Sequence, residues 1–323
     1  MSNLTKYNKI RHIHFLVAIF ACVFIISSCN TNNSGTIRET PTRGDIKLLV
    51  DESFKTLLQS SIDVFTSIYE DAYITPIYES EPDVINDFLR DTAKVMVVSK
   101  PLNESQVLFL NDSLIFPVTT PYFTDAVAFI VSKDNSDTLI RYKEMEGIIK
   151  GSFTRWDDLT YHRQSTQPGG IRIILDDARS GNIRFLKEVF NIEGTLPSNF
   201  FALENSEEIF DFVARNKDAM GIVSAAYLSN KQNPEQAANL KKINVVAISQ
   251  PDTDEKTFYR PSQASLMDGD YPFSRQVYFI SRESFPGLGT GFVQFATSEQ
   301  GQRIVLRSGL LPATIPTRVV KMP

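Results

Sequence analysis

Histidine and cysteine are both scarce in this sequence. Its three histidines are His12, His14 and His162, and the first two fall in a segment that reads as a leader. A single remaining histidine excludes a His-rich metal site and leaves no good base for a Ser-His-Asp triad. We therefore expect no metal, no cofactor and no catalytic residue.

The two cysteines, Cys22 and Cys29, both lie near the N-terminus. Residues 15–26 are an uninterrupted apolar run that follows a basic segment and precedes two serines and Cys29. Such a run is too short to span a bilayer as a mature helix and is typical of a secretory signal. The sequence Ile26-Ser27-Ser28-Cys29 resembles the bacterial lipobox, in which the cysteine thiol carries the lipid. We predict a lipoprotein signal peptide over residues 1–28 and lipidation of Cys29.

This reading leaves no cysteine for a disulfide, because Cys22 is removed and the Cys29 thiol is consumed. The exported chain must then rely on an apolar core for its stability. The full sequence has 323 residues, of which 42% are hydrophobic, and this is enough to form such a core. Residues 29–44 are polar and are predicted to be a flexible tether. The protein is thus expected to be lipid-anchored to a bacterial membrane and to face the periplasm.

The charge balance is acidic, with a formal net charge of -5. Lys6, Lys9 and Arg11 lie in the predicted leader, which has no acidic residue, so the remainder is more acidic still. A nucleic-acid partner is excluded, because binding to phosphates needs a basic surface.

Strand-like and helix-like segments alternate along the chain. Alternation of this kind predicts a sheet with helices on its faces, and its restart near Tyr142 predicts two α/β units. The predicted strands are residues 46–50, 73–78, 95–98, 126–131, 171–175, 244–248 and 276–280. The predicted helices are residues 57–68, 83–89, 142–149, 182–190, 291–297 and 299–308.

A glycine-rich segment, Gly287-Leu288-Gly289-Thr290-Gly291, looks like a phosphate-binding loop. It follows Pro286 instead of a strand and lacks the lysine of a P-loop. We predict that it is the entry to a helix.

Several segments resemble, in order and spacing, the phosphate-binding protein of the bacterial phosphate ABC transporter, a type II periplasmic binding protein. They are residues 146–159 with a Thr-x-Trp-x-Asp turn, 218–224, 271–275, and 292–302 followed by 309–312. The resemblance covers about residues 45–316.

This resemblance implies an α/β fold of two lobes, each a mixed sheet flanked by helices, joined by two crossing strands. The crossings are expected near residues 120–132 and 274–280. Lobe 1 would comprise residues 45–124 plus 277–323, and lobe 2 residues 125–276. A ligand would bind between the lobes.

The resemblance also places ligand groups. Ser180, Gly181 and Asn182, next to Arg179, match the family's Ser-Gly-Thr at a helix N-terminus, where backbone N–H groups bind anions. An ordinary Ser/Asn helix cap is the alternative. Hydroxyl groups are also expected after the first three strands of lobe 1, at Ser53, Ser80 and Ser99.

Two ligand positions depart from the family in charge. Lys100 stands where the family has an acidic residue, and Asp176 where it has a phosphate-binding arginine. Acidic residues also surround the serines, at Asp51, Glu52, Glu79 and Glu81. Lys100 and Asp176 could form an ion pair across the cleft in which the positions of the two charges are exchanged relative to the family. Phosphate binding would then be weak, because the family's arginine, which can donate two hydrogen bonds to phosphate, is missing.

The function predicted from the sequence is a monomeric solute-binding lipoprotein that delivers phosphate or a related oxyanion to an ABC permease. The alternative is a lipoprotein of the same fold that binds another ligand for sensing or adhesion. An esterase with Ser180 as nucleophile is disfavoured, because His162 lies in a polar loop with no reason to meet Ser180.

Overall fold

The computed structural model describes residues 39–160, 169–203, 205–229, 234–251 and 256–316. The predicted signal peptide, Cys29, most of the predicted tether and His162 lie outside these ranges. Within them, no helix combines the length and the apolar character needed to cross a membrane.

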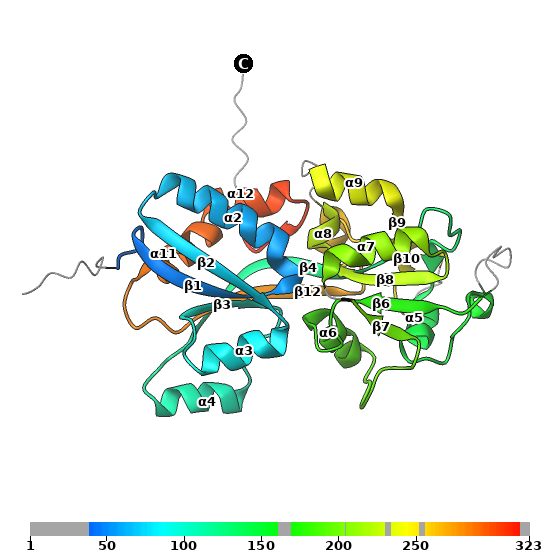
Figure 1. Cartoon of the computed structure of the whole chain (residues 1–323), viewed down its shortest axis with the longest axis horizontal. Helices are drawn as coiled ribbons and strands as arrows, with labels where there is room; N and C mark the ends of the chain where they lie inside the picture. Colours follow the sequence, from blue (N-terminus) through cyan, green and yellow to red (C-terminus); the bar gives the residue numbers. More distant parts are fainter. Residues whose placement is uncertain (1–38, 161–168, 204, 230–233, 252–255, 317–323) are drawn as a thin grey trace, which may run out of the picture. The chain divides into compact units, whose positions relative to one another are not determined.

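One mixed sheet runs through the molecule in the order β2-β1-β3-β12-β4-β8-β6-β7 (Figure 1). Its β1, β2 and β3 are parallel, as are β6, β7 and β8, whereas β12 and β4 pair antiparallel with each other and with these groups. The strands are β1 (Gly44–Asp51), β2 (Ala72–Glu79), β3 (Val95–Val98), β4 (Val118–Ser132), β6 (Arg172–Leu175), β7 (Phe200–Ala202), β8 (Ala219–Ser224) and β12 (Ser274–Ser281).

Short strands complete the structure. β9 (Ile243–Val245) and β13 (Leu311–Pro312) add to β4, and β5 (Leu139–Ile140), β10 (Ala247–Ser249) and β11 (Phe258–Tyr259) form a small second sheet. The predicted strand 244–248 is therefore wrong as one element. Residues 243–245 pair with β4 of the long sheet, whereas Ala247 and Ile248 pair with β5 of the second sheet. The buried Val246 lies between these two pairings and divides the segment into two strands.

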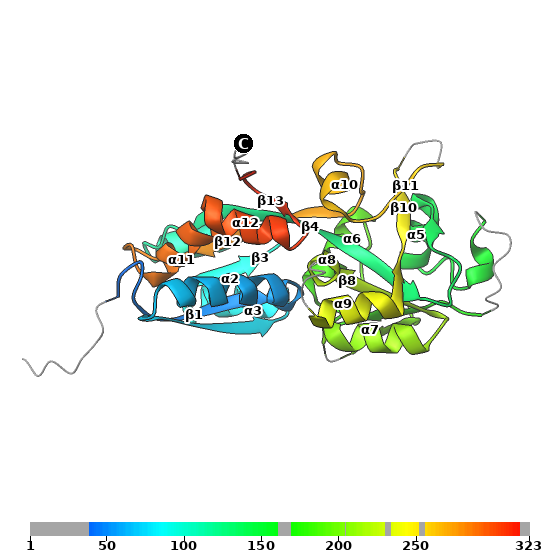
Figure 2. The same cartoon turned by 90° about the horizontal axis from the view of Figure 1, so that it is seen from above.

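Helices cover both halves of the long sheet (Figures 1 and 2). We call lobe 1 the half with β1–β3 and lobe 2 the half with β6–β8. The helices of lobe 1 are α2 (Lys55–Ile68), α3 (Glu81–Leu89), α4 (Glu104–Asp112), α11 (Leu288–Thr297) and α12 (Glu299–Arg307). Those of lobe 2 are α5 (Tyr142–Ile149), α6 (Gly181–Val189), α7 (Ser206–Arg215), α8 (Ala226–Ser229), α9 (Pro234–Lys242) and α10 (Gln263–Met267).

The two-lobed α/β architecture predicted from the sequence is confirmed. The C-terminal helices α11 and α12 return to lobe 1, where they contact α2. Trp156, the only tryptophan, is fully buried in lobe 2 and donates a hydrogen bond to the Asp218 carbonyl at 3.3 Å. Helix α4 was not predicted, although Asn103 and Gln106 form a capping box at its start.

The two lobes share β4, which is long enough to serve both. Residues 118–126 of β4 pair with β12, and Val127–Val131 pair with β8 of lobe 2. Because β12 also pairs with β3, this central pair of strands connects the two halves of the sheet. The exact residue boundaries of the lobes stay a prediction.

The glycine-rich segment forms the entry to α11, as predicted. Gly287 is the N-cap, the Glu283 carboxylate accepts the Gly289 N–H at 3.0 Å, and Glu39 accepts the Leu288 N–H at 3.0 Å. Gly291 packs against the backbone of Pro41, since a Cβ at Gly291 would lie 1.7 Å from the Pro41 carbonyl oxygen. The side chains of Glu39 and Glu283 and the backbone of Pro41 thus occupy the N-terminus of α11, where a phosphate would have to bind.

Gly291→Ala should destabilise the fold by about 1–3 kcal/mol, because a methyl group at that position overlaps backbone that cannot move alone. Gly170→Ala is the matched control, because its Cβ would lie 3.6 Å from the Thr154 carbonyl oxygen, an ordinary contact. Urea unfolding of both variants measures the difference, and equal effects would contradict the packing described.

Candidate functional site

A buried ion pair joins the two crossing strands. Arg275 of β12 lies directly opposite Asp125 of β4, and its Nε and Nη2 donate to Asp125 Oδ2 at 3.1 and 2.9 Å. Both side chains are essentially buried, and Ser224 Oγ donates to Asp125 Oδ1 at 2.8 Å. Burial raises the pKa of Asp125, against the opposing effect of the Arg275 charge. The pair holds a guanidinium at the junction of the lobes.

Arg275 reaches the ligand segment predicted from the sequence. Its Nη2 donates to Asn182 Oδ1 at 2.7 Å, and its guanidinium carbon lies 5.1 Å from the centroid of the Phe54 ring. Asn182 belongs to the first turn of α6, whose N-cap is Ser180. The charge therefore faces a helix N-terminus from lobe 2 and the end of β1 from lobe 1.

The N-terminus of α6 meets a carboxylate of lobe 1. Asp51, the last residue of β1, is fully buried, and its Oδ1 accepts the Ser53 N–H at 3.0 Å. Its Oδ2 lies 2.4 Å from where a Cβ of Gly181 would be, so only glycine allows this approach. Burial, followed by the nearby Glu81 charge, raises the pKa of Asp51 to about 7.

Asp176 lies behind Ser180, next to the start of α7. Its Oδ1 accepts the Asp177 N–H at 2.8 Å, and its Oδ2 accepts from Ser206 Oγ at 3.2 Å. Glu52 of lobe 1 accepts a hydrogen bond from the Ser206 backbone N–H. Burial raises the pKa of Asp176 and of Glu52. Carboxylates of the chain itself thus occupy the N-terminus of α7, a position that could otherwise bind an anion.

Glu81, at the start of α3, joins lobe 1 to lobe 2. It is buried, accepts from Ser99 N at 3.1 Å and Ser99 Oγ at 2.8 Å, and forms an ion pair with Arg184 of α6. Arg184 Nη2 also donates to Ser99 Oγ at 2.8 Å. Burial alone would raise the pKa of Glu81, but the hydrogen bonds and charge of Arg184 outweigh it and lower that pKa.

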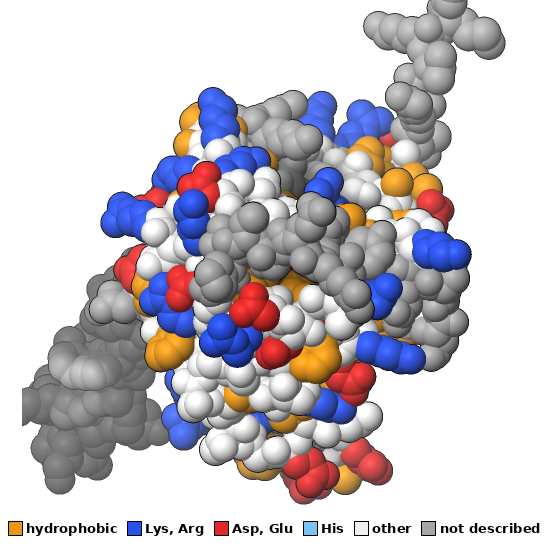
Figure 3. Space-filling model, turned by 90° about the vertical axis from the view of Figure 1, so that its right-hand side faces the viewer, with side chains coloured by type: hydrophobic (Ala, Val, Ile, Leu, Met, Phe, Trp, Pro, Cys, Tyr) orange, Lys and Arg blue, Asp and Glu red, His pale blue; other side chains and the backbone are white. Residues whose placement is uncertain are grey.

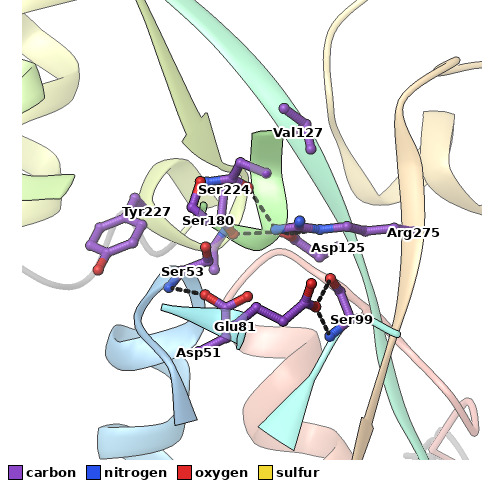
Figure 4. A network of polar contacts seen from close by, with 12 residues as sticks. Asp51, Ser53, Glu81, Ser99, Asp125, Val127, Ser180, Ser224, Tyr227 and Arg275 are labelled. Atoms are coloured by element: carbon purple, nitrogen blue, oxygen red, sulfur yellow. Dashed lines mark hydrogen bonds and ion pairs between the residues drawn. The ribbon is translucent and has the colours of Figure 1, made fainter. Parts of the chain in front are cut away.

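Four buried polar atoms of this cluster have no hydrogen-bond partner among the described residues. They are Asp51 Oδ2, Ser53 Oγ, Asn182 Nδ2 and Arg275 Nη1. Figure 4 shows Asp51, Ser53, Glu81 and Ser99 on the lobe 1 side, with Ser180, Asp125 and Arg275 facing them. Buried groups of this kind usually have partners, so their concentration at one place indicates a site for a small polar molecule.

The structure places the residues predicted from the sequence in two groups. Ser53, Ser99, Ser180, Gly181 and Asn182 lie in this buried cluster, and Asp176 lies directly behind it. The other three predicted residues lie at the rim.

At the rim, Ser80 Oγ donates to Asp83 at 2.6 Å, and Arg179 pairs with Asp83 and Asp177. Lys100 pairs with Glu188 and is about half-exposed. The reversed Lys100–Asp176 pair considered from the sequence is therefore wrong, because Lys100 turns to α6 and Asp176 to the starts of α6 and α7.

Three important residues were not among the predicted ligand groups: Asp125, Arg184 and Arg275. Arg275 ends the family-like segment Tyr271–Arg275, and Arg184 lies one turn into the helix that begins at Gly181. Asp125 and Arg275 each lie directly before a predicted apolar strand, 126–131 and 276–280, and these two opposite charges were the available signal.

The chain belongs to a known family. Residues 36–300 match the family model described as a PBP superfamily domain. A comparison with curated protein sequences finds no match.

Solved structures share the fold at low sequence identity. A protein from Clostridium perfringens, assigned to phosphate ABC transporter substrate-binding proteins and crystallised with phosphate, is 17% identical, with a TM-score of 0.69 over 84% of this chain and 100% of its own. An ABC-type phosphate transport receptor from Vibrio cholerae is 16% identical, with a TM-score of 0.62 over 83% and 100%. A phosphate-binding protein from Stenotrophomonas maltophilia is 14% identical, with a TM-score of 0.60 over 84% and 91%.

Asp125→Ala should destabilise the protein by about 3–5 kcal/mol, because it leaves the Arg275 guanidinium buried without its partner. Asp71→Ala, in which the removed carboxylate pairs with Arg43 at the exposed surface, is the control and should have little effect. Urea unfolding at neutral pH tests this, and two equal losses would show that the buried pair is not important for stability.

Asp51→Asn should change how stability depends on pH. The folded state binds the Asp51 proton more tightly than the unfolded state, so Asp51 makes stability fall as pH rises from about 4 to about 7. The variant should therefore gain roughly 1–4 kcal/mol relative to the parent between pH 4 and pH 8. Asp45→Asn, exposed on the same strand, should leave the profile parallel to that of the parent. Parallel profiles for Asp51→Asn would contradict the prediction.

Proposed function

We propose that this protein is an extracytoplasmic solute-binding component of an ABC-type uptake system that holds a small solute between its lobes. The observation that supports this proposal most directly is the group of four buried polar atoms without hydrogen-bond partners among the described residues. Lobe 1, lobe 2 and a crossing strand each contribute to this group. A site made from both lobes is what a protein that closes on its ligand requires. The names of the structural neighbours, which refer to phosphate transport, support the same role.

An anionic oxygen group fits one side of the site. Arg275 Nη1 and Asn182 Nδ2 are donors, Ser53 Oγ is able to donate, and α6 presents its N-terminus there. Such groups bind phosphate, sulfate or carboxylate oxygens. A phosphate or related oxyanion is the ligand class that the neighbours' names support.

A binding role also agrees with how Ser180 is used. Its hydroxyl accepts the Ile183 N–H at 3.5 Å as the N-cap of α6, and it also hydrogen-bonds Asp176. These bonds support a positioning role for Ser180 and give no support to the esterase alternative. Sensing or adhesion remains the second candidate function, and neighbouring permease and ATPase genes would favour uptake over it.

The surface of lobe 2 carries charges of both signs. Figure 3 shows basic and acidic side chains interspersed over the end of the molecule formed by lobe 2. We propose a monomer that is tethered through lipid on Cys29 and meets an ABC permease. This proposal rests on the lipobox-like sequence and on the family.

Isothermal titration calorimetry of the mature chain with phosphate, sulfate and small carboxylates tests the proposed site. Asn182→Ala removes a donor from the cluster, and we expect at least tenfold weaker binding, about 1.4 kcal/mol. Asn86→Ala, exposed on α3, is the control and should bind like the parent. Equal affinities of the two variants would mean that the solute binds elsewhere.

Cys29→Ala should leave the protein as an uncleaved precursor or release it from membranes, because the lipid would have no thiol to carry it. Membrane fractionation and mass spectrometry of the N-terminus measure both outcomes. An unmodified mature N-terminus at another residue in the parent protein would refute the lipid anchor.

A further inference from the structure

We propose that the solute is a small zwitterion, with an anionic oxygen group facing Arg275 and Asn182 and an ammonium group facing Asp51. This inference rests on the proposed solute-binding function and narrows it. The ligand would be an amino acid or aminophosphonate of a few heavy atoms, and simple phosphate would bind poorly.

The first argument is that most of the positions favourable to anions are already filled by this chain. Glu81 forms an ion pair with Arg184 and accepts a hydrogen bond from Ser99 Oγ. Asp125 accepts hydrogen bonds from two of the three nitrogens of Arg275. At the N-terminus of α7, Asp176 accepts a hydrogen bond from the Ser206 hydroxyl and Glu52 accepts one from the Ser206 N–H. The side-chain donors left for a ligand, beside the N-terminus of α6, are therefore few, namely Arg275 Nη1, Asn182 Nδ2 and the Ser53 hydroxyl.

The second argument is the sum of charges at the site. Five carboxylates surround it, at Asp51, Glu52, Glu81, Asp125 and Asp176, against the two guanidiniums of Arg184 and Arg275. Burial raises the pKa of Asp51, Glu52, Asp125 and Asp176, so this cluster disfavours further negative charge such as that of a phosphate dianion. Repulsion between like charges is strong where water is excluded. A ligand with a positive group avoids this cost.

The third argument is that the unpartnered atoms include both donors and an acceptor. Asp51 Oδ2 is a hydrogen-bond acceptor when the carboxyl is ionised, and it needs a donor from the ligand. Arg275 Nη1 and Asn182 Nδ2 are donors, and they need an acceptor from the same ligand. A zwitterion satisfies both ends with a charged group at each, whereas phosphate can bond to Asp51 only when one of the two carries a proton.

The ligand must be small, because Asp51 and Gly181 approach closely across the site. A larger groove of about 570 Å³, lined in part by Pro82, Arg179, Lys187 and Ile192, opens at the rim. In that groove Arg179 pairs with Asp83 and the partly buried Arg184 pairs with Glu188, and none of the residues with unpartnered atoms lines it.

The test compares ligands that differ only by an amino group. Calorimetric titrations of the mature chain at pH 7.5 would use methylphosphonate against aminomethylphosphonate, acetate against glycine, and inorganic phosphate. We expect at least one amino ligand to bind tenfold or more tightly than its amine-free partner and than phosphate. The pair that shows this difference identifies the anionic group as phosphonate or carboxylate.

The variant Asp51→Asn assigns the effect to a side chain. It should remove most of the advantage of the amino ligand and leave the affinity for its amine-free partner unchanged or higher. Asp63→Asn, exposed on α2, is the matched control and should retain the full difference. Circular dichroism confirms that both variants are folded.

Each other outcome has a distinct meaning. Phosphate or methylphosphonate binding as tightly as the amino ligands, with binding improved by Asp51→Asn, would overturn the zwitterion and leave the solute-binding function standing. Binding of the amino ligands that Asp51→Asn does not weaken would place the ammonium group elsewhere and also overturn it. No binding of any of the five ligands would contradict both the zwitterion and the proposed small-solute site.

Discussion

The ion pair between Arg275 and Asp125 is the interaction on which the rest of the site depends. It joins the two strands that both lobes share, in a position where neither charge reaches water. A buried guanidinium requires several acceptors, and Arg275 finds them in Asp125 and Asn182. The N-terminus of α6 is thereby fixed relative to the crossing strands, and one buried nitrogen of Arg275, Nη1, is left without a hydrogen-bond partner among the described residues.

The second constraint is that the chain supplies its own anions at the junction of the lobes. Asp51 is the last residue of β1 and Glu81 follows the neighbouring β2, and they meet Gly181 and Arg184 of α6. The Glu81–Arg184 pair stabilises the approach of the lobes, and the buried carboxyl groups also change which ligand the site can accept. In a fold whose structural neighbours are named for phosphate, the buried carboxylates argue for a ligand that brings positive charge with it.

The fold was predictable from the sequence because its signals are local and repeated. Val95–Val98 and Tyr142–Ile149 have the predicted bounds, since each is a short apolar strand or an amphipathic helix between clear breaks. The site was predictable only in part. Ser180, Gly181 and Asn182 carry a local motif, whereas Arg275 and Asp125 are far apart in sequence and meet only through strand pairing. The partner of Lys100 likewise depends on α6, which no local pattern around Lys100 indicates.

A crystal structure of the mature chain, grown with the amino ligand that titration selects, tests the central claim most directly. The account predicts density between the lobes, with acceptor atoms within hydrogen-bond distance of Arg275 Nη1 and Asn182 Nδ2 and a nitrogen next to Asp51 Oδ2. Density confined to the rim groove near Arg179 and Lys187, with the buried cluster unchanged, would contradict it.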